Sequence, residues 1–349
     1  MESTMELSVL RPVYEHEGPF ATVYLEGRSP SEDAHNQMRL RWKALRERLE
    51  GAGADNAALD AIGTALDGGA AGEEQTNGRV MVADASGVVL DEPWDAALGA
   101  GDDAHWTVLP ELGAYVRERA RGVRALVVVA DQEGAVVRRE VIARQHRPVV
   151  EGVTEVTGSA PEGMEKQRGQ AHAHSRVQRR AEEVVQRNAR DVVEYARKAA
   201  ESFRPDVLVL AGEVQARTAV RDEIGPDLLP LLTETDRGGD DGHSPDGALA
   251  EELLRIATAV DESVVKERTN AFREGLAHQE ATEGGTPVAA AAESGAVDTL
   301  LFEPGTDASR EAFLIKVCAG TGAAFGLVEE GTGMHEGVGS LLRFPPVPS

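Results

Sequence analysis

The sequence predicts an α/β (α+β) fold divided into three domains. Strand-like runs rich in Val, Leu and Ala alternate with longer helical patterns over the 349 residues, which indicates mixed sheets covered by helices. A chain of this length is expected to form two or three domains of about 100–200 residues each. We place them at residues 1–117, 118–240 and 241–349, with a linker in the acidic, Gly-rich stretch 233–247.

The first domain is predicted to combine a small sheet with helices. A helix capped by Ser31 or Asp33 is expected to end near Glu50, because its apolar residues recur with partial helical spacing. The other expected elements are a strand at 21–26, a second helix at 57–66, a hairpin at 80–90 and a helical segment at 111–121.

A second hairpin opens the middle domain, and its turn has the same spacing as the first. The pattern Ala-Asp-x-x-Gly occurs at residues 83–87 and again at residues 130–134. Asp favours such turns because its side chain bonds to nearby backbone amides, so Asp84 and Asp131 are interpreted as turn formers. The repeat predicts two similar hairpins, each of which opens a sheet.

The middle domain contains the most informative stretch, residues 161–201. A polar loop with Gly169 and Gln170 leads into a long amphipathic helix, which is followed by a strand at 207–212 and a short helix at 216–224. Between Lys166 and Arg190 this stretch has seven basic side chains against two acidic ones, a balance of +5 in a chain of net charge −24. Such a basic island indicates an anionic partner.

The last domain is expected to begin with a long helix at 249–276. Asp307 is expected to cap a second helix that ends at Gly320, because Asp is a preferred N-cap residue and Gly a preferred C-terminal stop. Residues 323–328 and 337–344 have the composition of strands.

These motifs resemble the archaeal and eukaryotic class-1 release factors and their relative Pelota. In the release factors a Gly-Gly-Gln loop precedes an Arg-rich helix and a strand, and here Arg168-Gly169-Gln170 stands in that place. Residues 289–302, which include Gly-Ala-Val-Asp-Thr-Leu-Leu, and residues 337–344 resemble the C-terminal domain of the same family, which is similar to the ribosomal L7Ae fold. The resemblance covers residues 118–344. It extends to bacterial members of the family, among them the ribosome hibernation factor Balon and its mycobacterial relatives.

The resemblance implies a ribosome-associated translation factor with a release-factor-like middle domain and an L7Ae-like α/β/α sandwich. It implies rRNA near the A site and the peptidyl transferase centre as the partner, and elongation factor Tu as a second candidate partner. The family's codon-reading Asn-Ile-Lys-Ser tetrapeptide is absent, so the expected role is occupation of the A site without codon reading, as a hibernation factor under stress. The expected rRNA-binding residues are Lys166, Arg168, Gln170, Arg176, Arg179, Arg180 and Arg187.

Catalysis is an open question at Gln170 and Gly169. In the family, the glutamine and its neighbouring glycines position a water at the peptidyl-tRNA ester, and glycine lets the backbone approach RNA closely. Arg168 replaces the first glycine and removes that freedom, so we expect a loop that does not hydrolyse the ester. Two alternatives stay open: a peptidyl-tRNA hydrolase in ribosome rescue, and a stress protein that binds another protein away from the ribosome.

Composition and missing motifs argue against other classes of function. Phosphate-binding loops, dinucleotide fingerprints and the usual zinc-protease and hydrolase motifs are absent, so no cofactor is expected. The single Cys318 excludes an internal disulfide, and His172 and His174, expected in an exposed loop, lack further ligands for a metal. Without a long apolar run or an N-terminal signal peptide, we expect a cytoplasmic protein with no membrane contact. The overall acidity argues against DNA as a partner.

Overall fold

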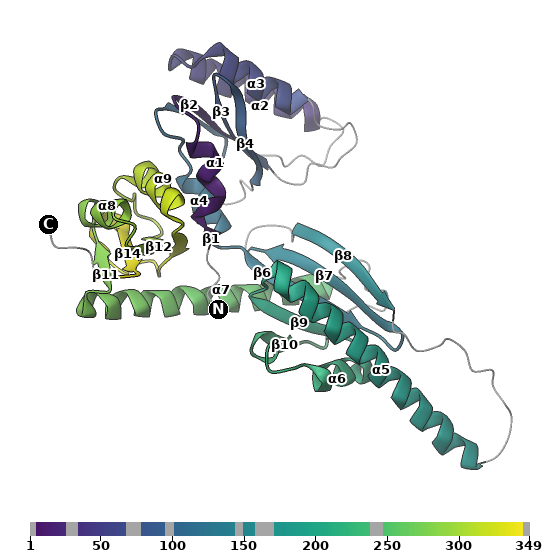
Figure 1. Cartoon of the computed structure of the whole chain (residues 1–349). Helices are drawn as coiled ribbons and strands as arrows, with labels where there is room; N and C mark the ends of the chain where they lie inside the picture. Colours follow the sequence, from purple (N-terminus) through teal and green to yellow (C-terminus); the bar gives the residue numbers. More distant parts are fainter. Residues whose placement is uncertain are drawn as a thin grey trace. The chain divides into compact units, whose positions relative to one another are not determined.

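A computed structural model describes residues 5–25, 34–67, 78–94, 101–143, 149–157, 171–237 and 247–344 (Figure 1). These residues form three sheets with helices packed against them. The chain separates into two compact units, one built on Gly122–Ser263 and the other on Thr4–Arg121 together with Val264–Ser349. The predicted mixed α/β class is confirmed. The predicted domain boundaries at 117/118 and 240/241 stay predictions.

The Gly122–Ser263 unit is built on a five-stranded mixed sheet of order β10-β9-β6-β7-β8. β9 runs parallel to both β6 and β10, whereas β7 is antiparallel to β6 and to β8. The antiparallel part is the second predicted hairpin, continued by one more strand. The strands are β6 (Val123–Ala130), β7 (Gly134–Ile142), β8 (Val149–Thr157), β9 (Val207–Gly212) and β10 (Leu232–Glu234).

Helices cover both faces of this sheet because successive residues of its central strands alternate between two apolar cores. Leu126 and Val128 of β6 pack with α5 (Ala171–Phe203) and α6 (Val214–Glu223). Val127 and Val129 of the same strand face the first half of α7 (Gly247–His278), which contributes Leu249, Leu253, Ile256 and Ala257. A short 3-10 turn, η3 (Leu229–Leu231), precedes β10.

The second unit contains the first predicted hairpin within a four-stranded antiparallel sheet of order β4-β3-β2-β5. Two helices pack on one face of it through residues such as Leu49, Leu59 and Ile62. The elements are β2 (Phe20–Leu25), α2 (Ala34–Gly51), α3 (Asn56–Asp67), β3 (Gly78–Asp84), β4 (Gly87–Trp94) and β5 (Asp103–Thr107). All but β5, which was not predicted, lie close to their predicted positions.

A five-stranded sheet of order β1-β13-β12-β14-β11 completes the second unit. Leu300 and Phe302 of β12 face a core with α8 and α9, whereas Leu301 between them packs with Phe272 of α7, so the sheet lies between two helical layers. The elements are β1 (Met5–Glu6), β11 (Ala281–Glu283), α8 (Gly285–Glu293), β12 (Val297–Phe302), α9 (Glu311–Thr321), β13 (Ala324–Leu327), η4 (His335–Gly337) and β14 (Val338–Leu342).

Residues from both ends of the sequence share one core in this unit. β1 pairs with β13, with Met5 opposite Phe325, and is followed by η1 (Leu7–Leu10) and α1 (Arg11–Tyr14), both of which pack into that core. From α4 (Gly113–Arg119), Arg117 donates to both carboxylate oxygens of Glu311 at 2.7 and 2.5 Å. The same guanidinium lies 4.8 Å from the ring centroid of Phe302.

One predicted cap is wrong. The helix expected to begin at Asp307 begins instead at Glu311, and its N-cap position is occupied by Arg310 in a left-handed conformation without a side-chain cap. The helix ends at Thr321 with Gly322, rather than Gly320, in the left-handed position that favours glycine. Asp307 therefore lies in the loop that precedes the helix.

Candidate nucleic-acid interface

The candidate interface lies on α5, which is anchored by its C-terminal half. Its buried residues are Asn188, Ala189, Val192, Val193, Ala196, Ala199 and Phe203. Residues 183–187 are exposed or only half-buried. The helix therefore packs on the sheet from Asn188 onwards, and its first turns extend past the sheet (Figure 1). This arrangement leaves residues 183–187 accessible to a partner.

Polar contacts fix the position of α5 against the sheet. The Asn188 amide, which is buried, donates to the Gln132 carbonyl in the β6–β7 turn at 3.1 Å. About two turns further along the helix, the Tyr195 hydroxyl donates to Thr154 of β8 at 2.7 Å. A buried amide left without its partner would destabilise the fold, so Asn188 specifies where along the sheet the helix is held.

The predicted binding residues are described only in part. Lys166, Arg168, Gly169 and Gln170 lie outside the described residues, and for Arg176, Arg179 and Arg180 only the helical backbone of α5 is described. Arg187 is exposed and forms no ion pair with the rest of the described chain. The assignment of this set to rRNA binding stays a prediction.

Cations further along α5 already have acidic partners. Arg190 lies 3.1 Å from Glu223, and Arg197 lies 3.0 Å from Asp227. The Lys198 ammonium hydrogen-bonds Glu194 at 2.8 Å and lowers the pKa of that carboxyl. Among the described cations of α5, Arg187 is therefore better placed to attract an anion than those on the anchored half of the helix.

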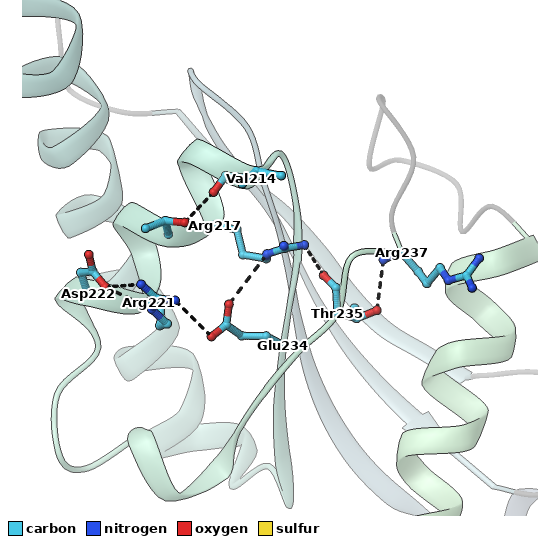
Figure 2. Close-up of polar contacts among 8 residues, drawn as sticks. Val214, Arg217, Arg221, Asp222, Glu234, Thr235 and Arg237 are labelled. Atoms are coloured by element: carbon cyan, nitrogen blue, oxygen red, sulfur yellow. Dashed lines mark hydrogen bonds and ion pairs between the residues drawn. The ribbon is translucent and has the colours of Figure 1, made fainter.

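A second set of arginines, on α6, was not predicted, although Arg217 and Arg221 share a helix face by their four-residue spacing. Figure 2 shows both guanidinium groups converging on Glu234 of β10, each at 3.8 Å. Arg217 also donates to the Thr235 carbonyl at 2.5 Å, and Arg221 contacts Asp222 at 2.8 Å. These contacts hold α6 against the edge strand β10 and pair the two arginines with carboxylates. We therefore assign this cluster a structural role rather than a role in binding an anion.

The histidines of the basic stretch lie in a different secondary structure from the one expected. His172 and His174 were expected in a loop, but α5 begins at Ala171 and includes both. No group of three or more His, Cys, Asp or Glu residues in the described part of the chain could hold a metal ion. Among the same residues, no helix has the length and apolar character needed to cross a membrane.

Comparison with known proteins identifies the segment that contains this interface. Residues 124–278 match the family described as bacterial archaeo-eukaryotic release factor family 2. No curated protein matches the sequence significantly.

Solved structures from archaea and yeast also match this chain at low sequence identity. A model of ribosome-bound archaeal Pelota with ABCE1 matches with 12% identity and a TM-score of 0.41, covering 98% of this chain and 95% of that one. Dom34 of S. cerevisiae, a translation termination-like factor, matches with 12% identity and a TM-score of 0.39, covering 99% and 94%. The archaeal termination factor aRF1 has 15% identity, a TM-score of 0.25 and 96% coverage of both chains. Residues 124–278, the segment that contains α5, are thus similar to the bacterial archaeo-eukaryotic release factor family 2.

Proposed function

We propose that this protein is a cytoplasmic translation factor that occupies the ribosomal A site without reading a codon and protects idle ribosomes during stress. The observation that carries this proposal is the match of residues 124–278 to the release-factor family, because that segment contains the Gly169-Gln170 dipeptide and the basic helix α5. Elongation factor Tu is proposed as a delivery partner on the sequence resemblance alone.

The arrangement of α5 supports contact with rRNA. A helix whose C-terminal half is packed and whose cations there are paired can present its other end to a phosphate backbone. Arginine is suited to this because its planar guanidinium donates two parallel hydrogen bonds to a phosphate. On a chain of net charge −24, such a local basic surface would direct binding to one orientation.

Competition for the A site tests the proposal directly. Purified full-length protein should co-sediment with vacant ribosomes, and prior filling of the A site with a non-hydrolysable aminoacyl-tRNA should reduce this binding at least about tenfold. The same protein should slow translation in an extract. Binding that is unaffected by A-site tRNA would overturn the proposed position, and no co-sedimentation at any salt concentration would favour a partner away from the ribosome.

Hydrolysis of peptidyl-tRNA is the second candidate function, and the Gly169-Gln170 dipeptide is the observation that favours it. Ester hydrolysis requires a water held at attack distance, and a displacement of about 1 Å can cost about 100-fold in rate. Because Arg168 precedes the dipeptide, we expect no peptide release from ribosomes with peptidyl-tRNA and an empty A site. Release that is lost in Gln170→Ala would establish the hydrolase instead.

A further inference from the structure

A second candidate site lies on the other unit, in a hollow between α2 and α3. Its volume is about 540 Å³, within the range of about 300–1,000 Å³ that is usual for small-molecule sites. The hollow is lined by Arg39, Leu40, Trp42, Lys43, Arg46, Asp60, Gly63, Thr64 and Asp67. These residues recur every three or four positions on each helix, so one face of α2 and one face of α3 form its two walls.

The two walls differ in chemistry. α2 contributes three cations, Arg39, Lys43 and Arg46, whereas α3 contributes Asp60, Thr64 and Asp67, which accept hydrogen bonds. Of these three cations, Arg46 is paired with two carboxylates: it donates to Glu50 and to Asp60, both at 2.8 Å. That second bond joins α2 to α3 within the hollow.

The other two cations are available to a ligand. Arg39 is exposed and has no ion-pair partner within the described ranges. Lys43 has only Glu47 at 4.0 Å, and both of these side chains are largely exposed, at 73% and 67%. Exposed pairs of this kind are weak and exchange readily for a better partner. An anionic group can therefore bind on the α2 wall.

Between the walls lies an aromatic surface held in place by the core. Trp42 packs partly against the core of α2, α3 and the four-stranded sheet, which fixes its ring. A Cβ at Gly63 would come within 3.3 Å of the indole nitrogen, so glycine lets the α3 backbone lie directly against the ring. A rigid aromatic side chain of this kind offers a surface to a flat apolar group, such as a nucleobase.

We propose that this hollow binds a nucleoside monophosphate. The phosphate contacts Arg39 and Lys43, the base lies against Trp42, and Thr64 and Asp67 accept hydrogen bonds from the ribose hydroxyls. Inorganic phosphate alone would leave the indole and the α3 wall unused. A continuous RNA strand would place further phosphates near the carboxylates of Asp60 and Asp67, which would repel them.

Calorimetric titration of the full-length protein with AMP, GMP, CMP and UMP tests this proposal. We expect saturable one-site binding of at least one nucleotide, with Kd below about 1 mM. The double variant R39Q/K43Q should weaken that binding at least about tenfold, because two charge-assisted hydrogen bonds to phosphate are lost. The control R48Q alters an exposed arginine of the same helix outside the hollow and should change Kd by less than about twofold.

A second variant guards against misfolding as the cause of lost binding. Gly63→Ala places a methyl group against the indole while improving helix propensity, so the fold should be kept and nucleotide binding should fall at least about fivefold. No saturation by any nucleotide at about 1 mM, or an unchanged Kd in R39Q/K43Q, would overturn the proposal. It would also be overturned if inorganic phosphate bound as tightly as the nucleotides, or if only hexauridylate bound.

Discussion

The two hairpins with the same Ala-Asp-x-x-Gly turn differ in what the turn does. In the second unit, Asp84 is buried and accepts hydrogen bonds from the Ser86 amide at 2.7 Å and the Ser86 hydroxyl at 2.5 Å, while its other oxygen lies 2.8 Å from His16. In the Gly122–Ser263 unit, Asp131 is exposed and accepts only from the amides of Glu133 and Gly134, both at 2.8 Å.

The glycines of the two turns are also needed for different reasons. Gly87 has φ of +142°, and a Cβ there would meet nothing within 4 Å, so it is required for its backbone conformation. Gly134 does not adopt a positive φ, but a Cβ there would lie only 1.9 Å from the Val156 carbonyl oxygen of β8. One sequence pattern thus forms a similar turn twice, while tertiary packing determines which atom of the pattern is critical.

The largest expected effect is that of Gly134→Ala. Because the added methyl group would collide with a strand backbone, the change should lower the free energy of unfolding of the Gly122–Ser263 unit by about 3 kcal/mol or more. Hydrogen exchange of β6, β7 and β8 measures this. The three tryptophans, Trp42, Trp94 and Trp106, all lie in the other unit, so the tryptophan fluorescence transition should not move. A shift of the fluorescence transition would contradict this separation.

Asp84→Asn should have the next largest effect. Burial opposes ionisation of Asp84, but the hydrogen bonds from Ser86 and His16 outweigh it and lower the pKa of the carboxyl below its ordinary 3.8. A depressed pKa contributes stability that is present above the ordinary value and is lost as the pH falls through the folded value. We expect a loss of about 1–2 kcal/mol at pH about 6, measured by urea denaturation with tryptophan fluorescence, and a smaller loss near pH 3.5.

Asp131→Asn is the matched control for that change. Its carboxylate is exposed and bonds only backbone amides of its own turn, which an asparagine side-chain oxygen can replace. We expect a change below about 0.5 kcal/mol in the same denaturation series, read by circular dichroism. An equal effect of the two substitutions would show that the turns are equivalent after all.

Gly87→Ala should have an effect similar in size to that of Asp84→Asn, about 1–2 kcal/mol on the tryptophan-monitored transition. The methyl group has open space, so the cost comes only from forcing an L-residue into a positive φ. Together with Gly134→Ala, this variant separates the backbone requirement from the packing requirement. A Gly87→Ala loss as large as that of Gly134→Ala would contradict the distinction.

Most elements of the fold could be predicted because their signals are local. The periodicity that predicted the basic helix corresponds to α5, and the two Asp-Gly turns correspond to the β3–β4 and β6–β7 hairpins. The pairing of β1 with β13 could not be predicted, since a two-residue strand has no pattern and its partner lies some 300 residues away. The Arg117–Glu311 ion pair could not be predicted either, because an ion pair between residues far apart in the chain produces no regular spacing in the sequence.

For the candidate site, the sequence predicted which basic residues the helix contains but not most of the contacts that these residues make in the fold. The four-residue spacing of Glu194 and Lys198 indicated their ion pair, but the sequence did not indicate that Glu223 and Asp227 would match Arg190 and Arg197, because these two carboxylates lie outside α5. Asn188 is a polar residue on the buried face of α5, and its bond to the Gln132 carbonyl explains how it is accommodated there. Lys166, Arg168, Gly169 and Gln170 lie outside the described residues, so their roles stay predictions.

Charge reversal on the two halves of α5 tests the central claim, that the first turns of this helix bind the ribosome. One variant changes Arg176, Arg179 and Arg180 to Glu, and its control changes Arg190, Arg197 and Lys198 to Glu, so both alter net charge equally and substitute a good helix former. Ribosome co-sedimentation over a salt series should show at least about tenfold weaker binding for the first variant and a salt slope smaller by about 3, with a change below about threefold for the control. Equal binding of both variants to that of the unmodified protein, or equal weakening of both, would contradict the claim.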